Sequence, residues 1–380
     1  DAEKDPFAMN PVLLTFDDPK TRAAYYKSFG AKKSTNNHRT GILNASVPAM
    51  VNTMALATIV LERAIDSPFR HHEDCAGYRR TMTDAAAPTE LSLTTVARVH
   101  DITTMFHSFV YFASEAVEEY AAVGVRGPSG YFASRSAPLG PVSAEVVTAT
   151  FYNFSPDLVR SAIDGTWEIV SPEEMQRARW RAVMRILDST VADAMADVDV
   201  SEAIGVAESC VADLSYAGRP LAAANASVLA RLDAPAFVDN RLLRLWQLVT
   251  ILREWRGDAH IGLLIAEPLD GCECTVVSEH LFHLPGVIRS TRAWSEDDWS
   301  KAVDRLRSRG WLDDDGVTGE GRTKRGLIER RTNEIDAVAW DGMTDAAVNR
   351  FGDLLEPAVE ALTMGGYFAV VGRPPPTPSV

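Results

Sequence analysis

Two histidines, His100 and His107, share one face of a predicted helix and are the first candidates for chemistry. Their spacing of seven residues places them two turns apart, about 10.5 Å along the axis, so the pair alone cannot chelate one metal ion. Tyr111 follows His107 on the same stripe after one further turn. Two interpretations stay open: partly buried helix histidines with hydrogen-bonded rings, or a pocket wall that contains His107 and Tyr111.

Arg135 lies in a segment that mixes aromatic, basic and turn residues, Gly130 to Gly140. Its planar guanidinium matches two oxygens of a ligand carboxylate or phosphate, but it can equally pair with a buried Asp or Glu. Asn153 lies in the aromatic run Phe151 to Phe154, where a core or capping role competes with ligand contact. Arg135 and Asn153 are therefore candidate ligand-binding residues.

The segment Arg256-Gly257-Asp258-Ala259-His260 predicts a break between one helix over 236–255 and another over 259–268. Asp258 would cap the second helix, and His260 would form a hydrogen bond across the helical body. A helix N-terminus also attracts anions, so Asp258 and His260 are candidates for polar groups of a pocket.

No metal site is assigned. Four potential zinc ligands occur in Cys272-x-Cys274-x5-His280-x2-His283, but structural zinc sites usually separate two ligand pairs further, and the cysteines also suit small apolar core positions. A second ligand-rich run, His71 to Cys75, falls in a predicted loop. The sequence contains no Gly-x-Gly-x-x-Gly, Walker-type loop, His-Glu-x-x-His or Gly-x-Ser-x-Gly, so the common nucleotide, metalloprotease and hydrolase chemistries have no support.

Composition limits the class of protein. The chain has 380 residues, 46% of them hydrophobic, which excludes wholesale disorder. Its net charge of −14 has the wrong sign for a general binder of nucleic acid or anionic membranes. Four cysteines are too few for a disulfide scaffold and favour a cytoplasmic protein. The longest apolar stretch, 47–61, is shorter than the roughly 20 residues of a membrane span.

Residues 1–81 differ from the rest in charge, with 11 Lys+Arg and 9 Asp+Glu, whereas the remainder is strongly acidic. We interpret them as a leader or an appended segment, with Met82 as a candidate natural start. A helix is expected over 49–65 and a strand over 12–16.

From residue 92 onward the hydrophobic spacing is helical almost throughout, and alternating strand patterns are scarce. The clearest helix start is Ser171-Pro172-Glu173-Glu174, a serine cap with proline at the first position and glutamate at the third. The expected fold class is all-α, with a multi-helix body over 90–255, a winged helix-turn-helix over 256–340 and a closing helix over 344–366. The apolar stripe of that last helix either covers the body or meets a second copy in a homodimer.

The winged domain is predicted from the order of its elements. Ser295 caps a helix to about Ser308, Gly310 ends it, and two very short strands around Asp313-Asp314-Asp315-Gly316 precede a helix that begins after Thr318. The run Val303 to Gly321 resembles the MarR-type winged helix. More broadly, residues 90–366 resemble an uncharacterised actinomycete helix-turn-helix family, in the segments 107–112, 130–140, 151–156 and 255–260. That resemblance implies a fold and no established activity.

DNA binding is disfavoured by the charge of the expected recognition helix. Its N-terminus is Glu296-Asp297-Asp298 and the wing is a turn of three aspartates, at places where phosphates would lie. Residues 286–340 contain 11 basic and 11 acidic side chains. A winged fold kept for packing or dimerisation is the competing interpretation.

These observations favour a small-molecule sensor or an atypical transcriptional regulator with weak or absent DNA binding. Its ligand would contact His107, Tyr111, Arg135, Asn153, Asp258 and His260. The alternative is an enzyme or a tetrapyrrole carrier that uses His107 or His260 for proton transfer or iron ligation. Neither the ligand nor a cofactor is identified by the sequence.

Overall fold

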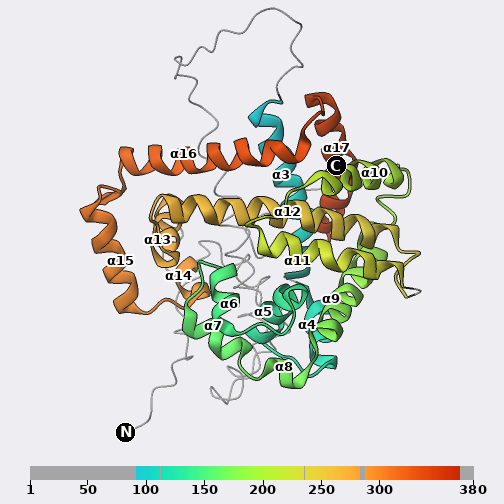
Figure 1. Ribbon diagram of the computed structural model, residues 1–380, viewed down its shortest axis with the longest axis horizontal. Coiled ribbons are helices and arrows are strands. Elements are labelled where there is room, and N and C mark those ends of the chain that lie inside the picture. The colour runs from blue at the N-terminus through green and yellow to red at the C-terminus, as the bar shows by residue number, and fades with distance from the viewer. Residues whose placement is uncertain (1–90, 112, 235, 283–286, 369–380) are drawn as a thin grey trace, which may run out of the picture. The chain divides into compact units, whose positions relative to one another are not determined.

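The computed structural model describes residues 91–368 except 112, 235 and 283–286, and this part is mostly helical, which confirms the predicted fold class (Figure 1). The expectations for residues 1–81 lie outside the described residues. We call residues 271–340 the winged part and the helices before them the body. The helices of the body are α3 (Leu93–Ser108), α4 (Ser114–Ala122), α5 (Pro128–Ser136), α6 (Ala144–Thr150), α7 (Pro156–Ile163), α8 (Thr166–Ile169), α9 (Pro172–Ile186), α10 (Val200–Asp213), α11 (Pro220–Leu229) and α12 (Arg241–Ala266). Short 3₁₀ turns occupy Phe109–Tyr111, Ala137–Leu139 and Ala230–Asp233, and a π-helical segment occupies Leu187–Val191.

The C-terminal third has the predicted order of helix, small hairpin and helix. Its elements are α13 (Gly271–Leu281), α14 (Val287–Arg292), α15 (Glu296–Ser308), β1 (Leu312–Asp313), β2 (Gly316–Val317), α16 (Gly319–Asp336), a 3₁₀ turn (Ala337–Trp340) and α17 (Asp345–Met364). The strands pair antiparallel, with Leu312 opposite Val317.

Local signals explain where these elements begin and end. The hydroxyl oxygens of Ser295 and Thr318 each accept a hydrogen bond from the third backbone N–H of the helix that follows. Gly310 ends α15 with φ of 72°, a left-handed conformation that glycine adopts without a Cβ clash. These predicted boundaries are confirmed.

Helix α12 corrects one prediction. It runs without interruption from Arg241 to Ala266, so the expected break at Gly257 is wrong. A glycine inside a helix lowers stability by only about 1 kcal/mol. Burial of the α12 residues from Leu245 to Arg256 contributes far more stability than that. Helices α3, α10, α11 and α16 all pack against it (Figure 1).

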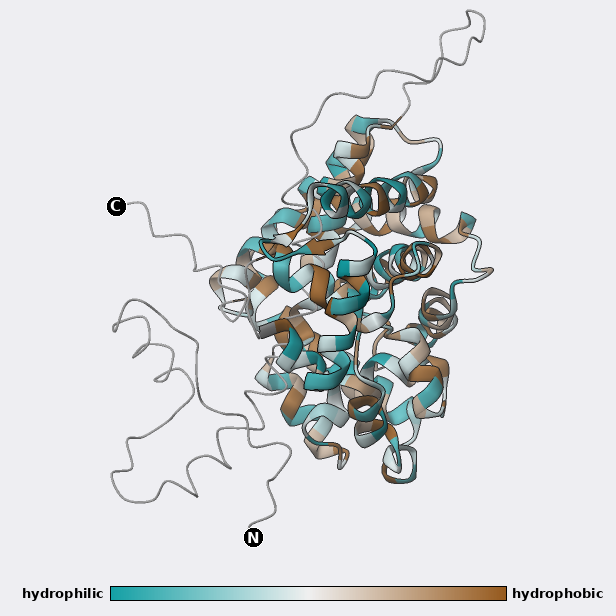
Figure 2. Ribbon diagram, turned by 90° about the vertical axis from the view of Figure 1, so that its left-hand side faces the viewer, coloured by the Kyte–Doolittle hydropathy of each residue, from teal (hydrophilic) through white to brown (hydrophobic). Residues whose placement is uncertain are grey.

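The buried apolar residues form two clusters. The larger cluster contains residues of the helices from α3 through α12 and of α17, and it includes Phe106, Trp180 and Trp246. The smaller, from Leu264 to Ile328, is built from the end of α12 and the winged part and includes Trp311. Most helices carry both hydrophobic and hydrophilic residues, as expected for elements that each turn one side to a core (Figure 2). No helix among the described residues is long and apolar enough to cross a membrane.

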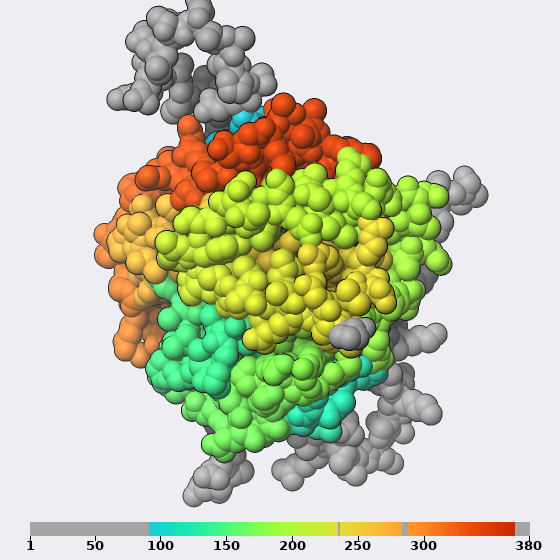
Figure 3. All heavy atoms as spheres, turned by 45° about the vertical axis from the view of Figure 1, so that its right-hand side comes forward, coloured from blue at the N-terminus to red at the C-terminus, as the bar shows by residue number. Residues whose placement is uncertain are grey.

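Helix α17 covers the body rather than leaving its apolar stripe open. Val348, Phe351 and Leu355 are buried and belong to the larger cluster. The helix packs closely on α3, where a Cβ at Gly352 would lie 3.1 Å from Ile102 Cδ1. In the space-filling view the C-terminal red segment lies directly against the yellow-green segment of α10 (Figure 3).

The first turn of α13 touches the backbone between α6 and α7. A Cβ at Gly271 would lie 2.0 Å from the carbonyl oxygen of Tyr152, a distance that no side chain tolerates. The Tyr152 hydroxyl also donates a hydrogen bond to the Leu269 carbonyl oxygen at 2.6 Å. This contact fixes the winged part against the body.

We therefore expect Gly271→Ala to lower the free energy of unfolding by about 1–3 kcal/mol, because two backbone segments must separate. Gly262→Ala is the matched control, since Gly262 lies exposed near the C-terminal end of α12 and no heavy atom lies within 4 Å of its Cβ position. It should raise stability by up to about 1 kcal/mol. Equal effects of the two substitutions in urea unfolding would contradict the close approach at Gly271.

Candidate functional site

A cavity of about 110 Å³ lies where the two hydrophobic clusters meet. Its walls come from α3, α5, α11, α12 and the segment 150–154 on one side, and from α13 and α16 of the winged part on the other. The volume is well above the roughly 10–15 Å³ that one water requires and below the roughly 300–1,000 Å³ of sites for drug-sized ligands. The cavity therefore suits a small ligand.

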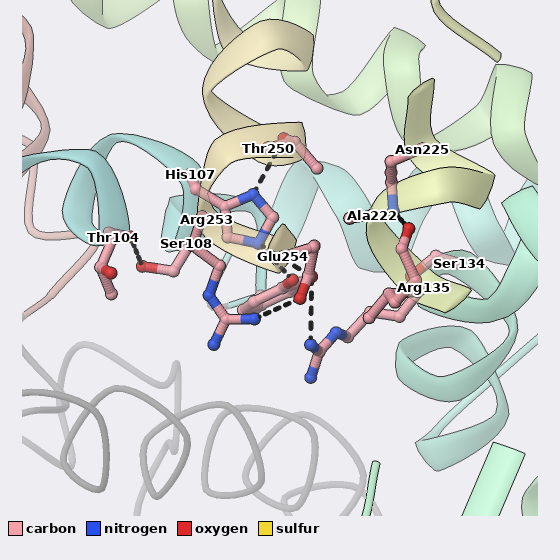
Figure 4. Close-up of polar contacts among 12 residues, drawn as sticks. Thr104, His107, Ser108, Ser134, Arg135, Ala222, Asn225, Thr250, Arg253 and Glu254 are labelled. Carbon is pink, nitrogen blue, oxygen red and sulfur yellow. Dashed lines mark hydrogen bonds and ion pairs between the residues drawn. The ribbon is translucent and has the colours of Figure 1, made fainter. Parts of the chain in front are cut away.

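The charged side chains of the lining centre on Glu254. Its carboxylate oxygen Oε1 accepts a hydrogen bond from Nη2 of Arg135 at 3.2 Å, and Oε2 accepts one from Nη1 of Arg253 (Figure 4). All three side chains are buried. Burial alone would raise the pKa of Glu254, but Arg253 and Arg135 lower it to about 2. Glu254 is therefore ionised.

Arg135 is fixed from several directions. Nη1 donates to the Tyr131 hydroxyl at 2.7 Å, and the guanidinium carbon lies 4.4 Å from the centre of the Phe151 ring. Its Nε atom is buried and has no hydrogen-bond partner among the described residues. Of the two alternatives for Arg135, pairing with a buried acid is the one present, and one donor remains unused.

His107 and Tyr111 lie one layer behind the cavity and are not part of its lining. The Thr250 hydroxyl donates to the Trp246 carbonyl oxygen at 2.8 Å, so it accepts from His107 Nδ1–H at 2.9 Å. Nε2 then accepts from the Tyr111 hydroxyl at 2.6 Å. Because burial lowers the pKa of His107 to about 3, the ring is neutral, and neither nitrogen is left for a metal or for proton transfer.

His260 repeats this hydrogen-bond pattern but keeps one nitrogen unused. The Thr332 hydroxyl donates to the Ile328 carbonyl oxygen, so it accepts from His260 Nδ1–H at 3.0 Å. Burial lowers the pKa of His260 to about 3, although Glu329 opposes this. The ring lines the cavity, and Nε2 has no described partner.

Asp258 caps a helix, but not the predicted one. Its Oδ2 accepts hydrogen bonds from the backbone N–H groups of Leu221 (3.1 Å) and Ala222 (3.0 Å), at the start of α11. The expected cap of a helix beginning at 259 is wrong because α12 continues through that point. Burial raises the pKa of Asp258 to about 6.

Asn153 lies between α6 and α7 and lines the cavity. Its carbonyl oxygen accepts hydrogen bonds from the Thr275 hydroxyl at 3.3 Å and from the Trp294 indole N–H at 3.1 Å. These contacts join the body to the winged part. Of the six predicted site residues, the structure thus brings Arg135, Asn153, Asp258 and His260 to one cavity.

Sequence reasoning missed the charged residues Arg253, Glu254, Arg256 and Arg325, all of which line the cavity. A signal was present for the first three: charges in the run Leu252-Arg-Glu-Trp-Arg256 interrupt the apolar face of a helix that is buried on all sides. Arg325 gave no such signal because it lies in the highly charged helix α16.

The two cysteines of the run from Cys272 to His283, to which the sequence assigned no metal site, lie in the core. Cys272 and Cys274 are buried in the smaller cluster, and burial raises the pKa of the Cys272 thiol to about 12. Among the described residues no group of three potential ligands could hold a metal ion. His283 and the run His71 to Cys75 lie outside that part of the chain.

The basic side chains around the expected recognition helix α15 pair with carboxylates of the protein itself. Arg305 contacts Asp270 and Glu273, and Arg309 contacts Glu273 at 2.8 Å. Lys301 contacts Asp297 within α15. These pairs leave little uncompensated positive charge for phosphates on this helix.

Comparison with known proteins gives one family match. A model described as a helix-turn-helix family matches residues 96–369. No curated protein and no solved structure matches the chain.

Besides His100, whose pKa burial also lowers, two neutral histidines, His107 and His260, predict acid sensitivity. Each has a pKa of about 3 in the folded protein and about 6.5 when unfolded, so the unfolded state binds more protons between these values. Their contribution to stability is complete above pH 6.5 and falls as the pH drops towards 3, by up to about 1.4 kcal/mol per pH unit for each ring.

His260→Asn keeps a donor near the position of Nδ1 and removes the titration. In urea unfolding from pH 7 to pH 4 its stability should fall less steeply than that of the wild type. His280→Asn, at an exposed histidine of α13, controls for the substitution itself. A His260→Asn slope as steep as that of the wild type would contradict a neutral His260.

Proposed function

Since the chain belongs to a helix-turn-helix family, we propose that it is a small-molecule sensor with a MarR-like winged domain and weak or absent DNA binding. Its ligand occupies the cavity between the body and the winged part. Occupancy changes how the winged part sits on the body. This makes the protein an atypical regulator whose readout is a change in domain arrangement.

The main support for this proposal is that the walls of the cavity come from both the body and the winged part. Arg135 and Leu221 belong to the body, whereas Val277 and Arg325 belong to the winged part. A ligand that touches both walls has a different affinity for arrangements that differ in their spacing, and that difference is what shifts a conformational equilibrium. A ligand that touched only one wall would bind the different arrangements equally well and could not shift the equilibrium between them.

The geometry supports a sensor better than a tetrapyrrole carrier or an enzyme that uses His107. Both ring nitrogens of His107 are hydrogen-bonded inside the body, so iron ligation would break a buried network. The cavity of about 110 Å³ is also small for a macrocycle.

DNA binding should be weak at physiological salt. Gel-shift titration with genomic fragments is expected to give only non-specific affinity, with a Kd of about 10⁻⁴ M or weaker, because α15 begins with three exposed acidic side chains. Glu296→Gln combined with Asp297→Asn should strengthen binding at low salt. A specific complex with a Kd near 10⁻⁸ M would overturn this part of the proposal.

The cavity itself is tested by Gly257→Ala. A Cβ at Gly257 would lie 3.5 Å from Glu254 Oε2 and 3.6 Å from Arg253 Nη1, which is ordinary contact, so the methyl group enters the cavity without a clash. The variant should be more stable than the wild type by up to about 1 kcal/mol, yet lose thermal stabilisation by the small molecules that stabilise the wild type. Gly262→Ala should keep that response.

Movement is measured between spin labels on Glu168→Cys in the body and Asp304→Cys in α15, both exposed positions. Small molecules that stabilise the wild type against heat should change the distribution of distances between the two labels. A ligand that binds the cavity and leaves the distribution unchanged would refute the sensor function.

A further inference from the structure

The charged side chains that line the cavity are already paired within the protein. Each of the four arginines of the lining contacts at least one carboxylate, in the pairs Arg135–Glu254, Arg253–Glu254, Arg256–Glu329, Arg256–Asp336 and Arg325–Glu329. Asp258 accepts hydrogen bonds from two backbone N–H groups at the start of α11, where the helix dipole favours a negative charge. A charged ligand would lose its hydration and then compete with these existing contacts, so the lining favours an uncharged ligand.

Three hydroxyl groups of the lining have already donated their protons. The hydroxyls of Thr150 and Ser278 each donate to the carbonyl oxygen four residues earlier, both at 2.8 Å. The Tyr152 hydroxyl donates to the Leu269 carbonyl oxygen at 2.6 Å. Each of these oxygens keeps lone pairs that can accept a hydrogen bond. Towards a ligand, the three hydroxyls are therefore acceptors.

His260 adds a fourth acceptor to the lining. Its Nδ1–H is donated to the Thr332 hydroxyl oxygen at 3.0 Å, so Nε2 of the neutral ring carries a lone pair and no proton. The side chain is 14% exposed and lines the cavity, and Nε2 has no partner among the described residues. An acceptor shielded from water and left unpaired is costly, and a donor on the ligand would remove that cost.

These four acceptors discriminate among polar groups of a ligand. A carboxylate has no proton to donate, and a ketone has none either. An alkylammonium has three donors but would place a further positive charge beside four guanidinium groups. A primary amide is uncharged and has two N–H donors, and its carbonyl oxygen can accept from a lining arginine. The amide therefore matches the lining best.

The rest of the lining is apolar and limits the size of the ligand. Phe151, Ile261, Leu264, Leu269 and Val277 contribute to the walls. An apolar cavity of about 150 Å³ takes up benzene, so the cavity of about 110 Å³ suits a molecule of about six non-hydrogen atoms. Such a molecule combines an amide group with a short hydrocarbon chain.

We propose that the cavity binds a small, uncharged primary amide, which donates its N–H groups to His260 Nε2 and to hydroxyl oxygens of the lining. Its hydrocarbon chain packs against Leu264 and its neighbours. This inference rests on the proposed function only in taking the same cavity as the ligand site. It specifies the class of ligand: a hydrogen-bond donor without charge, joined to a short apolar group.

Calorimetric titration of the full chain with butyramide, butyrate and 2-pentanone tests the proposal. The three molecules are close in shape, but only the amide has donors, only the carboxylate has a charge, and the ketone has neither. Butyramide should bind about 5- to 100-fold more tightly than each of the other two, because they leave the acceptors unpaired. Propionamide, which has one CH₂ group fewer, should bind about fourfold more weakly than butyramide.

His260→Phe removes the acceptor and keeps an aromatic ring at the cavity. The preference for butyramide over 2-pentanone should shrink to about threefold or less, while the affinity for 2-pentanone changes little. A role of His260 in structure alone would weaken both ligands equally. His280→Phe, at an exposed position of α13, is the control and should keep the preference.

The hydroxyl acceptors offer a second test that does not depend on the folding of His260→Phe. Thr150 and Thr363 are 7% and 8% exposed, Ser278 and Ser136 are 3% and 0% exposed, and all four hydroxyls donate to the carbonyl oxygen four residues earlier. Only Thr150 and Ser278 line the cavity. Thr150→Val combined with Ser278→Ala should reduce the preference for butyramide. Thr363→Val combined with Ser136→Ala should leave it within about twofold.

The proposal is overturned if butyrate or 2-pentanone binds as tightly as butyramide, or if neither amide binds saturably up to about 10 mM. A preference for butyramide that survives both in His260→Phe and in the variant of Thr150 and Ser278 would also overturn it, and its loss in either one supports the proposal. Amide binding without a change in the spin-label distances would refute the sensor and keep this site. A ligand without N–H or O–H groups that changes those distances would do the reverse.

Discussion

The arrangement around the cavity depends on one buried ion cluster, in which the Glu254 carboxylate is held between the guanidinium groups of Arg135 and Arg253. Glu254 lies on α12, which contacts α3, α9, α10, α11 and α16, and Arg135 lies on α5. A carboxylate with 3% exposure persists in its charged form only because these cations surround it. The cluster therefore ties the position of α5 to α12 and sets the charge of the cavity.

Two hydrogen-bond relays keep neutral rings beside this charge. In each, a threonine hydroxyl donates its proton to a helix carbonyl oxygen and therefore accepts a hydrogen bond from a histidine Nδ1–H. Thr250 does this for His107, and Thr332 does it for His260. The relays fix the tautomers and avoid further positive charge near the arginines. They differ in one respect, since Nε2 of His107 is occupied by Tyr111 and Nε2 of His260 is not.

The sequence predicted what local chemistry decides. The caps at Ser171 and Ser295, the helix start after Thr318 and the turn at Gly310 are set by residues within one helical turn of each other, and the structure has them. The continuity of α12 could not be predicted, because burial from several helices outweighs the local preference of Gly257. The pairing of Arg135 with Glu254 joins residues 119 positions apart, and no periodicity encodes such a pair.

The most direct test of the account measures the unfolding free energy of Glu254→Gln with and without added formate. The neutral, isosteric side chain leaves Arg135 with no described carboxylate within 4 Å, so we expect a loss of about 3–5 kcal/mol that formate partly restores and formamide does not. A variant as stable as the wild type, or one that formamide restores equally well, would contradict a stabilising role of the Glu254 charge in this cluster.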